Sequence, residues 1–214
     1  MGKGEAVFVL LLSKRKIVLF GRGESAVIMK HKILSWNVRG LNDRDKRMRI
    51  NNLLRLWKVD IVCFQDTKME SISNCFVQSL WGCPYVNWCH VVSRGASGGI
   101  LLMLDCRAVS RIDSCFSRFV VAYSFRNVDD GLVWAFARVY GRNRDHLRWW
   151  LWEELARLIS LWDVPWCIGG DISVTLFLDE RSRGAAHRSA VADFADFVAE
   201  QSLMDLPMAG GGST

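Results

Sequence analysis

Hydrophobic and polar positions follow two different rhythms along the chain. From Lys32 onward, short apolar runs of strand length alternate with stretches in which apolar residues recur every three or four positions. The apolar runs predict strands at residues 32–37, 59–64, 85–93, 98–105, 118–127, 132–141 and 166–170. The helical rhythm predicts helices after the N-cap Asp43, at 71–81, at 145–162 and around 189–203.

The order of these elements predicts mixed sheets. The run VDIVCF at 59–64 is apolar throughout, as expected for a strand that is covered on both faces. The runs between residues 85 and 141 follow one another without helices, and NVDDG at 127–131 has the residues of a hairpin turn. We therefore expect α/β layers with mixed sheets rather than a doubly wound parallel sheet.

The helix expected at 145–162 has the clearest amphipathic pattern. We expect its apolar side chains to form a single buried stripe, and Asp145 to cap its first turn. The stripe consists of Leu147, Trp150, Leu151, Leu155, Leu158, Ile159 and Trp162.

The chain of 214 residues suits one large domain. We expect residues 1–28 to be a poorly patterned leader that need not be ordered, and residues 29–214 to form the domain. No apolar segment is long enough to span a membrane, and AVFVLLL at 6–12 lacks a cleavage site of the kind that follows a signal peptide. We expect a nuclear or cytoplasmic protein that is not secreted.

The charge of the chain is moderately basic. Its net charge of +6 comes from 28 basic and 22 acidic residues, which permits a nucleic-acid or phosphate partner without requiring one. Basic residues cluster in SKRK at 13–16 and DRDKRMR at 43–49. A solvated surface is the more frequent origin of such clusters, and weak binding of nucleic acid is the alternative.

The cysteines do not predict a structural metal or a disulfide framework. There are seven, an odd number, and none forms a Cys-x-x-Cys pair. Cys63 and Cys167 stand inside apolar runs, where cysteine packs as a small hydrophobic residue. A reducing compartment fits this usage.

Polar residues fall at the carboxyl ends of several of the predicted strands. Asn37, Asp66, Tyr140 and Asp171 each stand at the carboxyl end of a strand, where α/β sheets gather their reactive groups. Mg²⁺ prefers oxygen ligands and takes one or two carboxylates, so this set predicts a hard-cation site suited to phosphate-ester hydrolysis. Each residue also has a plain structural alternative as a turn former, a helix cap or a strand end.

Six segments follow one another along the chain: ILSWNVRGLND, VDIVCFQDTK, GASGGILLMLD, VYGRNRDHLRWWLWEEL, WCIGGDISV and FADFVAEQSLMDLPMAGGGST. As an ordered set they resemble the endonuclease/exonuclease/phosphatase superfamily, and specifically the endonuclease domain of plant LINE-type (non-LTR) retrotransposon polyproteins. The resemblance covers residues 29–214.

The resemblance implies a deoxyribonuclease I-like fold, a four-layer sandwich of two mixed β-sheets flanked by helices. It implies cleavage of a DNA phosphodiester with Mg²⁺, or with Mn²⁺ in its place. Asn37 and Asp66 would hold the metal, Tyr140 would donate to the phosphate, and Asp171 would orient or deprotonate the attacking water. Position 173 would contact the phosphoryl group that is transferred.

The sequence departs from the family pattern in three places. Asp66 stands where the family has glutamate, and the shorter side chain is expected to weaken metal binding. Ser173 stands where the family has asparagine, which offers more hydrogen-bonding groups. The family's final Ser-Asp-His motif does not follow, so we expect the fold to lack its last strands. His146 is not expected to replace the missing histidine, because it lies at the start of a helix.

Three functions remain open from the sequence. The first is a Mg²⁺-dependent DNA endonuclease that is impaired in this copy. The second is a non-catalytic retroelement remnant that binds nucleic acid weakly or not at all. The third is a phosphomonoesterase of the same superfamily. We expect no membrane partner, and the sequence does not distinguish DNA from RNA.

Overall fold

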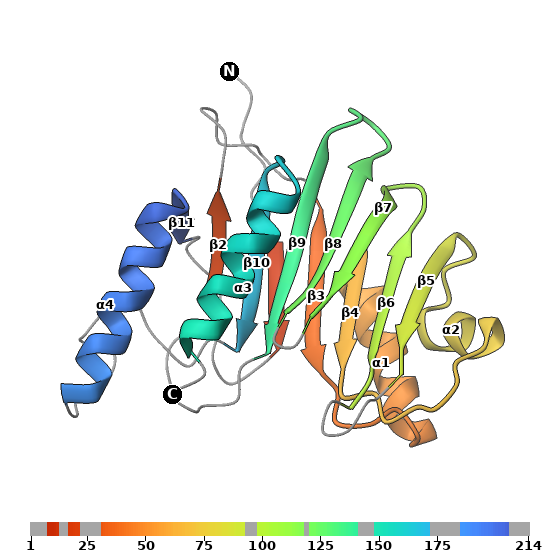
Figure 1. Ribbon diagram of the computed structural model, residues 1–214. Helices are drawn as coiled ribbons and strands as arrows, with labels where there is room; N and C mark the ends of the chain where they lie inside the picture. The colour runs from red at the N-terminus through yellow and green to blue at the C-terminus, as the bar shows by residue number, and fades with distance from the viewer. Residues whose placement is uncertain are drawn as a thin grey trace. The chain divides into compact units, whose positions relative to one another are not determined.

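The computed structural model describes residues 8–12, 17–21, 31–92, 98–117, 120–140, 148–171 and 185–205. The chain divides into two units. The first takes its residues from 1–13, 27–110 and 126–132, and the second from 14–26, 111–125 and 133–214. The elements of both units are labelled in Figure 1.

The first unit contains a five-stranded sheet with the order β1-β3-β4-β6-β5. β1 pairs parallel to β3 and β3 parallel to β4, whereas β6 runs antiparallel to both β4 and β5, so the sheet is mixed. Its strands are β1 (Phe8–Leu12), β3 (Lys32–Asn37), β4 (Ile61–Gln65), β5 (Val86–Val91) and β6 (Ile100–Asp105).

Helices α1 (Arg44–Trp57) and α2 (Asn74–Trp81) begin and end at clear caps. The Asp43 carboxylate accepts hydrogen bonds from the Asp45 and Lys46 amides, and the Lys46 amide bond is the main cause of the lowered pKa of Asp43. Lys58 ends α1 in a left-handed conformation. Ser73 and Gly82 cap α2 at its two ends.

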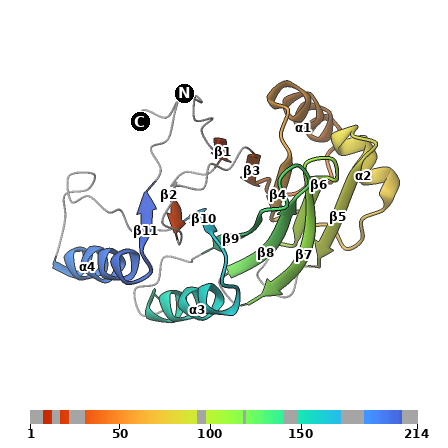
Figure 2. The same ribbon diagram turned by 90° about the horizontal axis from the view of Figure 1, so that it is seen from above.

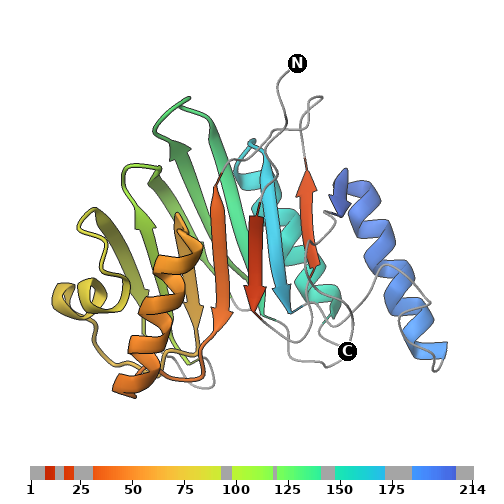
Figure 3. The ribbon, with the colours of Figure 1, turned by 180° about the vertical axis from the view of Figure 1, so that it is seen from behind.

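Both helices cover the same face of the five-stranded sheet (Figure 3). Alternate strand residues meet the apolar stripes of the helices there, as the two periodicities require. The buried residues of this core are Leu34, Val38, Leu41, Ile50, Leu54, Val59, Val62, Phe64, Val77, Leu80, Trp81, Leu101 and Met103.

The second sheet has six strands in the order β11-β2-β10-β9-β8-β7. β10 runs parallel to β9 and antiparallel to β2, so this sheet is mixed as well. Its strands are β2 (Ile17–Gly21), β7 (Val109–Phe116), β8 (Val120–Asn127), β9 (Val133–Tyr140), β10 (Trp166–Asp171) and β11 (Leu203–Asp205).

Helices α3 (Arg148–Leu161) and α4 (Ala185–Glu200), both labelled in Figure 2, belong to the second unit. Leu151, Leu155 and Ile159 of α3 pack on the apolar residues of β8, β9 and β10. Trp152 stacks on Phe197 of α4, with 5.0 Å between the ring centroids. The two helices therefore share one hydrophobic core with the sheet.

The expected fold class is confirmed, because the chain contains two mixed β-sheets flanked by helices. The hairpin turn at 127–131 is present between β8 and β9, where the Asn127 amide donates to the Leu132 carbonyl at 2.9 Å. Cys63 and Cys167 are fully buried, as expected, and burial raises the pKa of the Cys167 thiol to about 12. The division of the chain into a leader and a domain at residue 29 stays a prediction.

Residues 1–28 were expected to be a poorly patterned leader, and their described parts are β1 and β2, which pair with β3 and β10. The helix expected around 189–203 is present as the helix Ala185–Glu200, which ends before Ser202, a residue with a left-handed backbone that precedes β11. One local expectation was wrong, because Trp150 was expected in the buried stripe but is 54% exposed.

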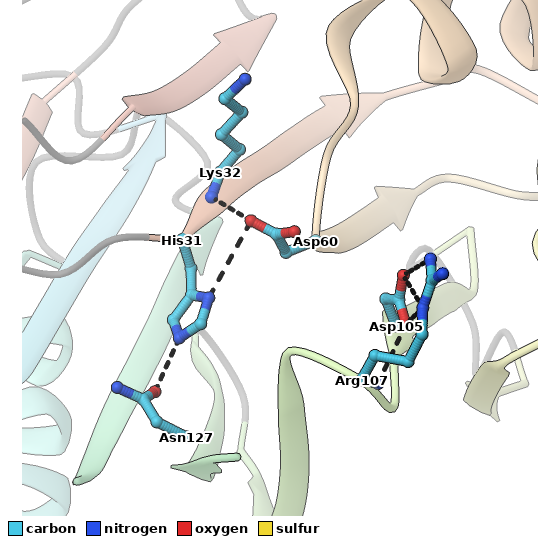
Figure 4. A network of polar contacts seen from close by, with 6 residues as sticks. All are labelled: His31, Lys32, Asp60, Asp105, Arg107 and Asn127. Carbon is cyan, nitrogen blue, oxygen red and sulfur yellow. Dashed lines mark hydrogen bonds and ion pairs between the residues drawn. The ribbon is translucent and has the colours of Figure 1, made fainter. Parts of the chain in front are cut away.

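A polar network joins the start of β3 to the turn after β8 within the first unit (Figure 4). The buried His31 places Nε2 at 2.7 Å from Asn127 Oδ1 and Nδ1 at 3.9 Å from Asp60 Oδ2. The Asp60 carboxylate also accepts the Lys32 amide at 2.8 Å. Burying an imidazole requires such partners, so the network fixes where β3 begins.

Candidate functional site

Asn37 and Asp66 are brought to the same edge of the five-stranded sheet. Asn37 is the last residue of β3 and is paired in register with Gln65, the last residue of the parallel strand β4. Asp66 follows Gln65 directly; its side chain is half-buried, whereas that of Asn37 is exposed. The strand-end placement expected for these two residues is therefore present.

The chain continues beyond both strands as a hydrogen-bonded pair of loops. The Val38 amide donates to the Gln65 carbonyl at 2.9 Å, and the Gly40 amide to the Asp66 carbonyl at 2.6 Å. The Leu41 amide then donates to the Thr67 carbonyl at 2.9 Å. These bonds extend the contact between the two segments past the sheet, so the loop after β3 is held beside Asp66.

Left-handed backbone conformations gather in these two loops. Arg39, Asp66 and Lys68 have φ values of 50°, 54° and 53°, and Gly40 has 95°. Such conformations are unfavourable for most residues and persist where the surrounding structure enforces them, often at functional sites. Aspartate tolerates this conformation better than most side chains, which suits Asp66 to its position.

The side chain of Asn37 turns back to its own loop. Its Oδ1 atom accepts the Arg39 amide at 3.2 Å. This bond fixes the plane of the Asn37 side-chain amide. The NH₂ group of that amide points away from the Arg39 amide and can donate to another partner. The carbonyl oxygen has a second lone pair, so it keeps the capacity to accept another partner.

Gly98 and Gly99 form a third segment at the site, and the pattern of strands and helices did not reveal their role. A Cβ atom on Gly98 would come within 1.7 Å of Asp66 Oδ1, and one on Gly99 within 2.7 Å of Thr67 Oγ1. Their carbonyls accept the Lys68 amide at 2.7 Å and the Thr67 amide at 3.2 Å. The only signal in the sequence was a pair of glycines directly before an apolar run.

His90 of β5 is a second residue that the sequence did not single out. Its Nε2 atom is buried and has no hydrogen-bond partner within the described part of the chain. Burial lowers the pKa of this imidazole, which favours its neutral form. Nε2 would lie 3.5 Å from a Cβ on Gly99, so the ring borders the glycine segment.

Tyr140 and Asp171 form a corresponding pair in the second unit. They are the last residues of the parallel strands β9 and β10 and are partners in register. Their strand-end placement therefore agrees with the expectation. Ser173, Asp145 and His146 lie outside the residues that the structure describes.

The donor atoms of the first pair suit a hard cation. Asp66 offers a carboxylate and Asn37 an amide oxygen, and Mg²⁺ takes such oxygen ligands while keeping water or substrate oxygens in its other positions. Across the described residues there is no cluster of three or more His, Cys, Asp or Glu side chains that could hold a metal. None of the described helices is long and apolar enough to cross a membrane.

Two mixed sheets flanked by helices, with polar residues at the carboxyl ends of parallel strands, define an α+β protein whose strand ends can carry a polar site. The sequence matches the Endonuclease/Exonuclease/phosphatase family over residues 34–208. The chain therefore belongs to this family, whose members generally depend on a divalent metal.

Solved structures of low sequence identity share the fold. An AP endonuclease from Leishmania major is 14% identical, with 79% of this chain and 66% of that structure covered and a TM-score of 0.53. A family member from Bacteroides thetaiotaomicron is 13% identical, covering 82% and 70%, with a TM-score of 0.52. A mannosyl-6-phosphatase from Bacteroides thetaiotaomicron is 14% identical, covering 75% and 70%, with a TM-score of 0.51.

The chain spans roughly two thirds of the length of the solved structures it resembles, from 66% to 70% for the three described above. No curated protein matches it. The likeness to the solved structures shows the fold, and it leaves both a nuclease and a phosphatase as candidate activities.

Proposed function

We propose that this chain has the machinery of a Mg²⁺-dependent phosphodiesterase that cleaves DNA, weakened in this copy. The observation that carries the proposal is the pairing of Asn37 with the Gln65–Asp66 strand end, where both adjoining loops adopt left-handed conformations. That combination brings one half-buried carboxylate and one exposed amide together at the carboxyl ends of two neighbouring strands, which supports a site for a hard cation and a phosphate ester.

Each residue has a separate role in this proposal. Asp66 and Asn37 would hold the cation, which when bound polarises a phosphoryl oxygen and stabilises negative charge on it. Asp171 would accept a proton from the attacking water or orient it. Tyr140 would donate its phenolic proton in a hydrogen bond to a phosphate oxygen.

DNA is the proposed substrate because of the charge at the site and the resemblance of the sequence. Arg39 and Lys68 are exposed in the two loops beside Asp66, and the chain has a net charge of +6. Cations beside a phosphodiester site favour a polyanionic substrate. The motif set resembles that of plant LINE-type retrotransposon endonucleases, and we propose that origin for the chain.

Weakened activity is proposed from two substitutions. Asp66 is one methylene shorter than the family's glutamate, which withdraws a metal ligand from a site that depends on close positioning. Ser173 replaces an asparagine that offers two amide donors. Loss of one such donor costs about 10²–10³ in rate where it stabilises the transition state.

Two alternatives are tested against this proposal. A phosphomonoesterase is favoured by the similar fold of the mannosyl-6-phosphatase structure. A non-catalytic remnant that at most binds nucleic acid weakly is favoured by the two substitutions at the site.

The deciding experiment is nicking of supercoiled plasmid DNA by the purified chain with Mg²⁺ or Mn²⁺. The proposal expects slow nicking that is abolished by EDTA and in both Asp66→Asn and Asp171→Ala. Hydrolysis of a small phosphomonoester without nicking would support the phosphatase. Neither activity, with salt-sensitive DNA binding retained, would support the remnant.

A further inference from the structure

Besides Arg44, two further basic side chains stand in the first turn of α1, where the helix dipole disfavours them. Lys46 and Arg47 are the third and fourth residues of a helix whose N-terminus carries partial positive charge and favours acidic residues. Asp43 and Asp45 follow that preference. The placement of two cations there calls for a compensating interaction.

Both cations turn back onto the loop between β3 and α1. The Lys46 ammonium donates to the Val38 carbonyl and, at 3.4 Å, to the Arg39 carbonyl. Arg47 Nη1 donates to the Leu41 and Asn42 carbonyls at 2.8 Å each. The basic run at 43–49 is therefore only partly a solvated surface.

The same loop uses its amides to contact the two site residues. The Arg39 amide donates to Asn37 Oδ1 at 3.2 Å, and the Gly40 amide donates to the Asp66 carbonyl at 2.6 Å. The carbonyl groups of the loop thus accept hydrogen bonds from side chains of α1, and its amide groups donate hydrogen bonds to Asn37 and Asp66.

The planarity of the peptide bond connects these two sets of contacts. The Val38 carbonyl and the Arg39 amide belong to one rigid peptide unit, and the Arg39 carbonyl and the Gly40 amide belong to the next. Lys46 binds the carbonyl of each unit, and the amide of each unit points in the opposite direction, to Asn37 and to the Asp66 backbone. Arg47 binds later peptide units that make no such contact.

We propose that Lys46 is a positioning residue of the candidate site, which orients the Asn37 amide and the Asp66 backbone through the Val38–Arg39 and Arg39–Gly40 peptide planes. The proposal rests on the proposed function only for its effect on catalysis. Its structural part concerns the free protein and does not require activity.

The test is amide hydrogen exchange of the full chain, measured by NMR at Arg39 and Gly40 without added metal. In Lys46→Met, which keeps an unbranched side chain and removes the ammonium, exchange at these two amides should be about tenfold faster, as expected for loss of a charged hydrogen bond. The Asn37 side-chain NH₂ signals should shift. Lys46→Arg should restore most of the protection.

Arg49→Met is the matched control, because it removes one exposed charge from the same helix. It should leave exchange at Arg39 and Gly40 unchanged. Unchanged exchange in Lys46→Met would overturn the proposal. An equal acceleration throughout β3 and α1 would also overturn it, because that result indicates general destabilisation.

Catalysis supplies a second readout. If the wild-type chain nicks DNA, Lys46→Met should lower kcat at least tenfold with little change in KM, since the substrate contacts remain. A lower affinity for DNA with unchanged kcat would contradict positioning. If the wild-type chain shows no hydrolysis, the proposed function fails, while the exchange result still decides the role of Lys46.

Discussion

The carboxylate of Asp66 lies directly against the backbone of Gly98. A Cβ atom on Gly98 would lie 1.7 Å from Asp66 Oδ1 and 2.7 Å from Asp66 Cα, closer than any real contact. The Lys68 amide also donates to the Gly98 carbonyl at 2.7 Å. The position of Asp66 after β4 therefore depends on the glycines before β6, and the position of these glycines depends on Asp66.

Replacing Gly98 by alanine should displace Asp66. Because backbone as well as side-chain atoms would collide, we expect a loss of about 1–3 kcal/mol in the free energy of unfolding. We also expect about a 10²-fold loss of any Mg²⁺-dependent activity, the effect of a misplacement near 1 Å. Urea unfolding and plasmid nicking measure the two effects.

Gly131→Ala is the control for the Gly98 variant. Gly131 has a φ of 70° with nothing within 4 Å of a built Cβ, so alanine there meets only backbone strain. It should cost about 1 kcal/mol and leave activity unchanged. Wild-type stability and activity in Gly98→Ala would disprove the close contact.

The sequence predicted the elements whose signals are local. The strand at 32–37 was predicted with its observed bounds, and the helix after Asp43 begins at its predicted cap. In both cases the apolar spacing and the flanking residues lie within one element, so no distant contact is needed to interpret them.

The features that were missed depend on distant contacts. β7 is an edge strand with several exposed residues in succession, so its sequence lacks the alternation of a strand with one buried face. The need for glycine at position 98 comes from Asp66, which lies in the loop after β4 and is distant in the sequence. Single-segment patterns contain neither kind of information.

The length of the Asp66 side chain can be tested by Asp66→Glu. The longer side chain should tighten Mg²⁺ binding, because it restores the methylene that the family's glutamate has. It should also lower the free energy of unfolding by about 1 kcal/mol, since aspartate tolerates the left-handed conformation at φ 54° better than glutamate. Calorimetric Mg²⁺ titration and urea unfolding separate the two effects.

Asp66→Asn tests whether the charge of Asp66 is needed for Mg²⁺ binding. It keeps the shape and the tolerance of a left-handed backbone but removes the charge, so it should abolish Mg²⁺ binding with little effect on stability. Equal Mg²⁺ affinity in all three proteins would show that Asp66 is not a ligand.

The ion pair of Asp105 with Arg107 should make stability depend on pH. Arg107 Nε lies 3.0 Å from Asp105 Oδ1, and its guanidinium stacks over the Tyr85 ring (Figure 4 shows the ion pair). Hydrogen bonds from Arg107 hold the pKa of Asp105 below its ordinary value. The contribution is therefore complete above the unfolded pKa, about 3.9, and is lost as the pH falls through the lower folded value.

Arg107→Met should lower the free energy of unfolding only slightly at pH 7, because the guanidinium is largely exposed and the ion pair is screened by solvent. Urea unfolding at pH 7, 5 and 3 should show the difference from wild type unchanged between the first two and smaller at the third. Arg111→Met, another exposed charge removal, should show no such trend. A difference that stays constant down to pH 3 would contradict the assignment.

Trp150 and Trp152 of α3 should respond very differently to truncation. Trp152 is 8% exposed and stacks on Phe197, whereas Trp150 is 54% exposed. Residues two positions apart on a helix point about 200° apart, so only one of them faces α4 and the sheet. Trp152→Ala should lower the free energy of unfolding by about 3–5 kcal/mol, and Trp150→Ala by less than about 0.5 kcal/mol. Urea unfolding of both variants compares the same Trp→Ala change at a buried and an exposed position of α3. Similar losses in the free energy of unfolding would show that α3 is rotated relative to the arrangement described.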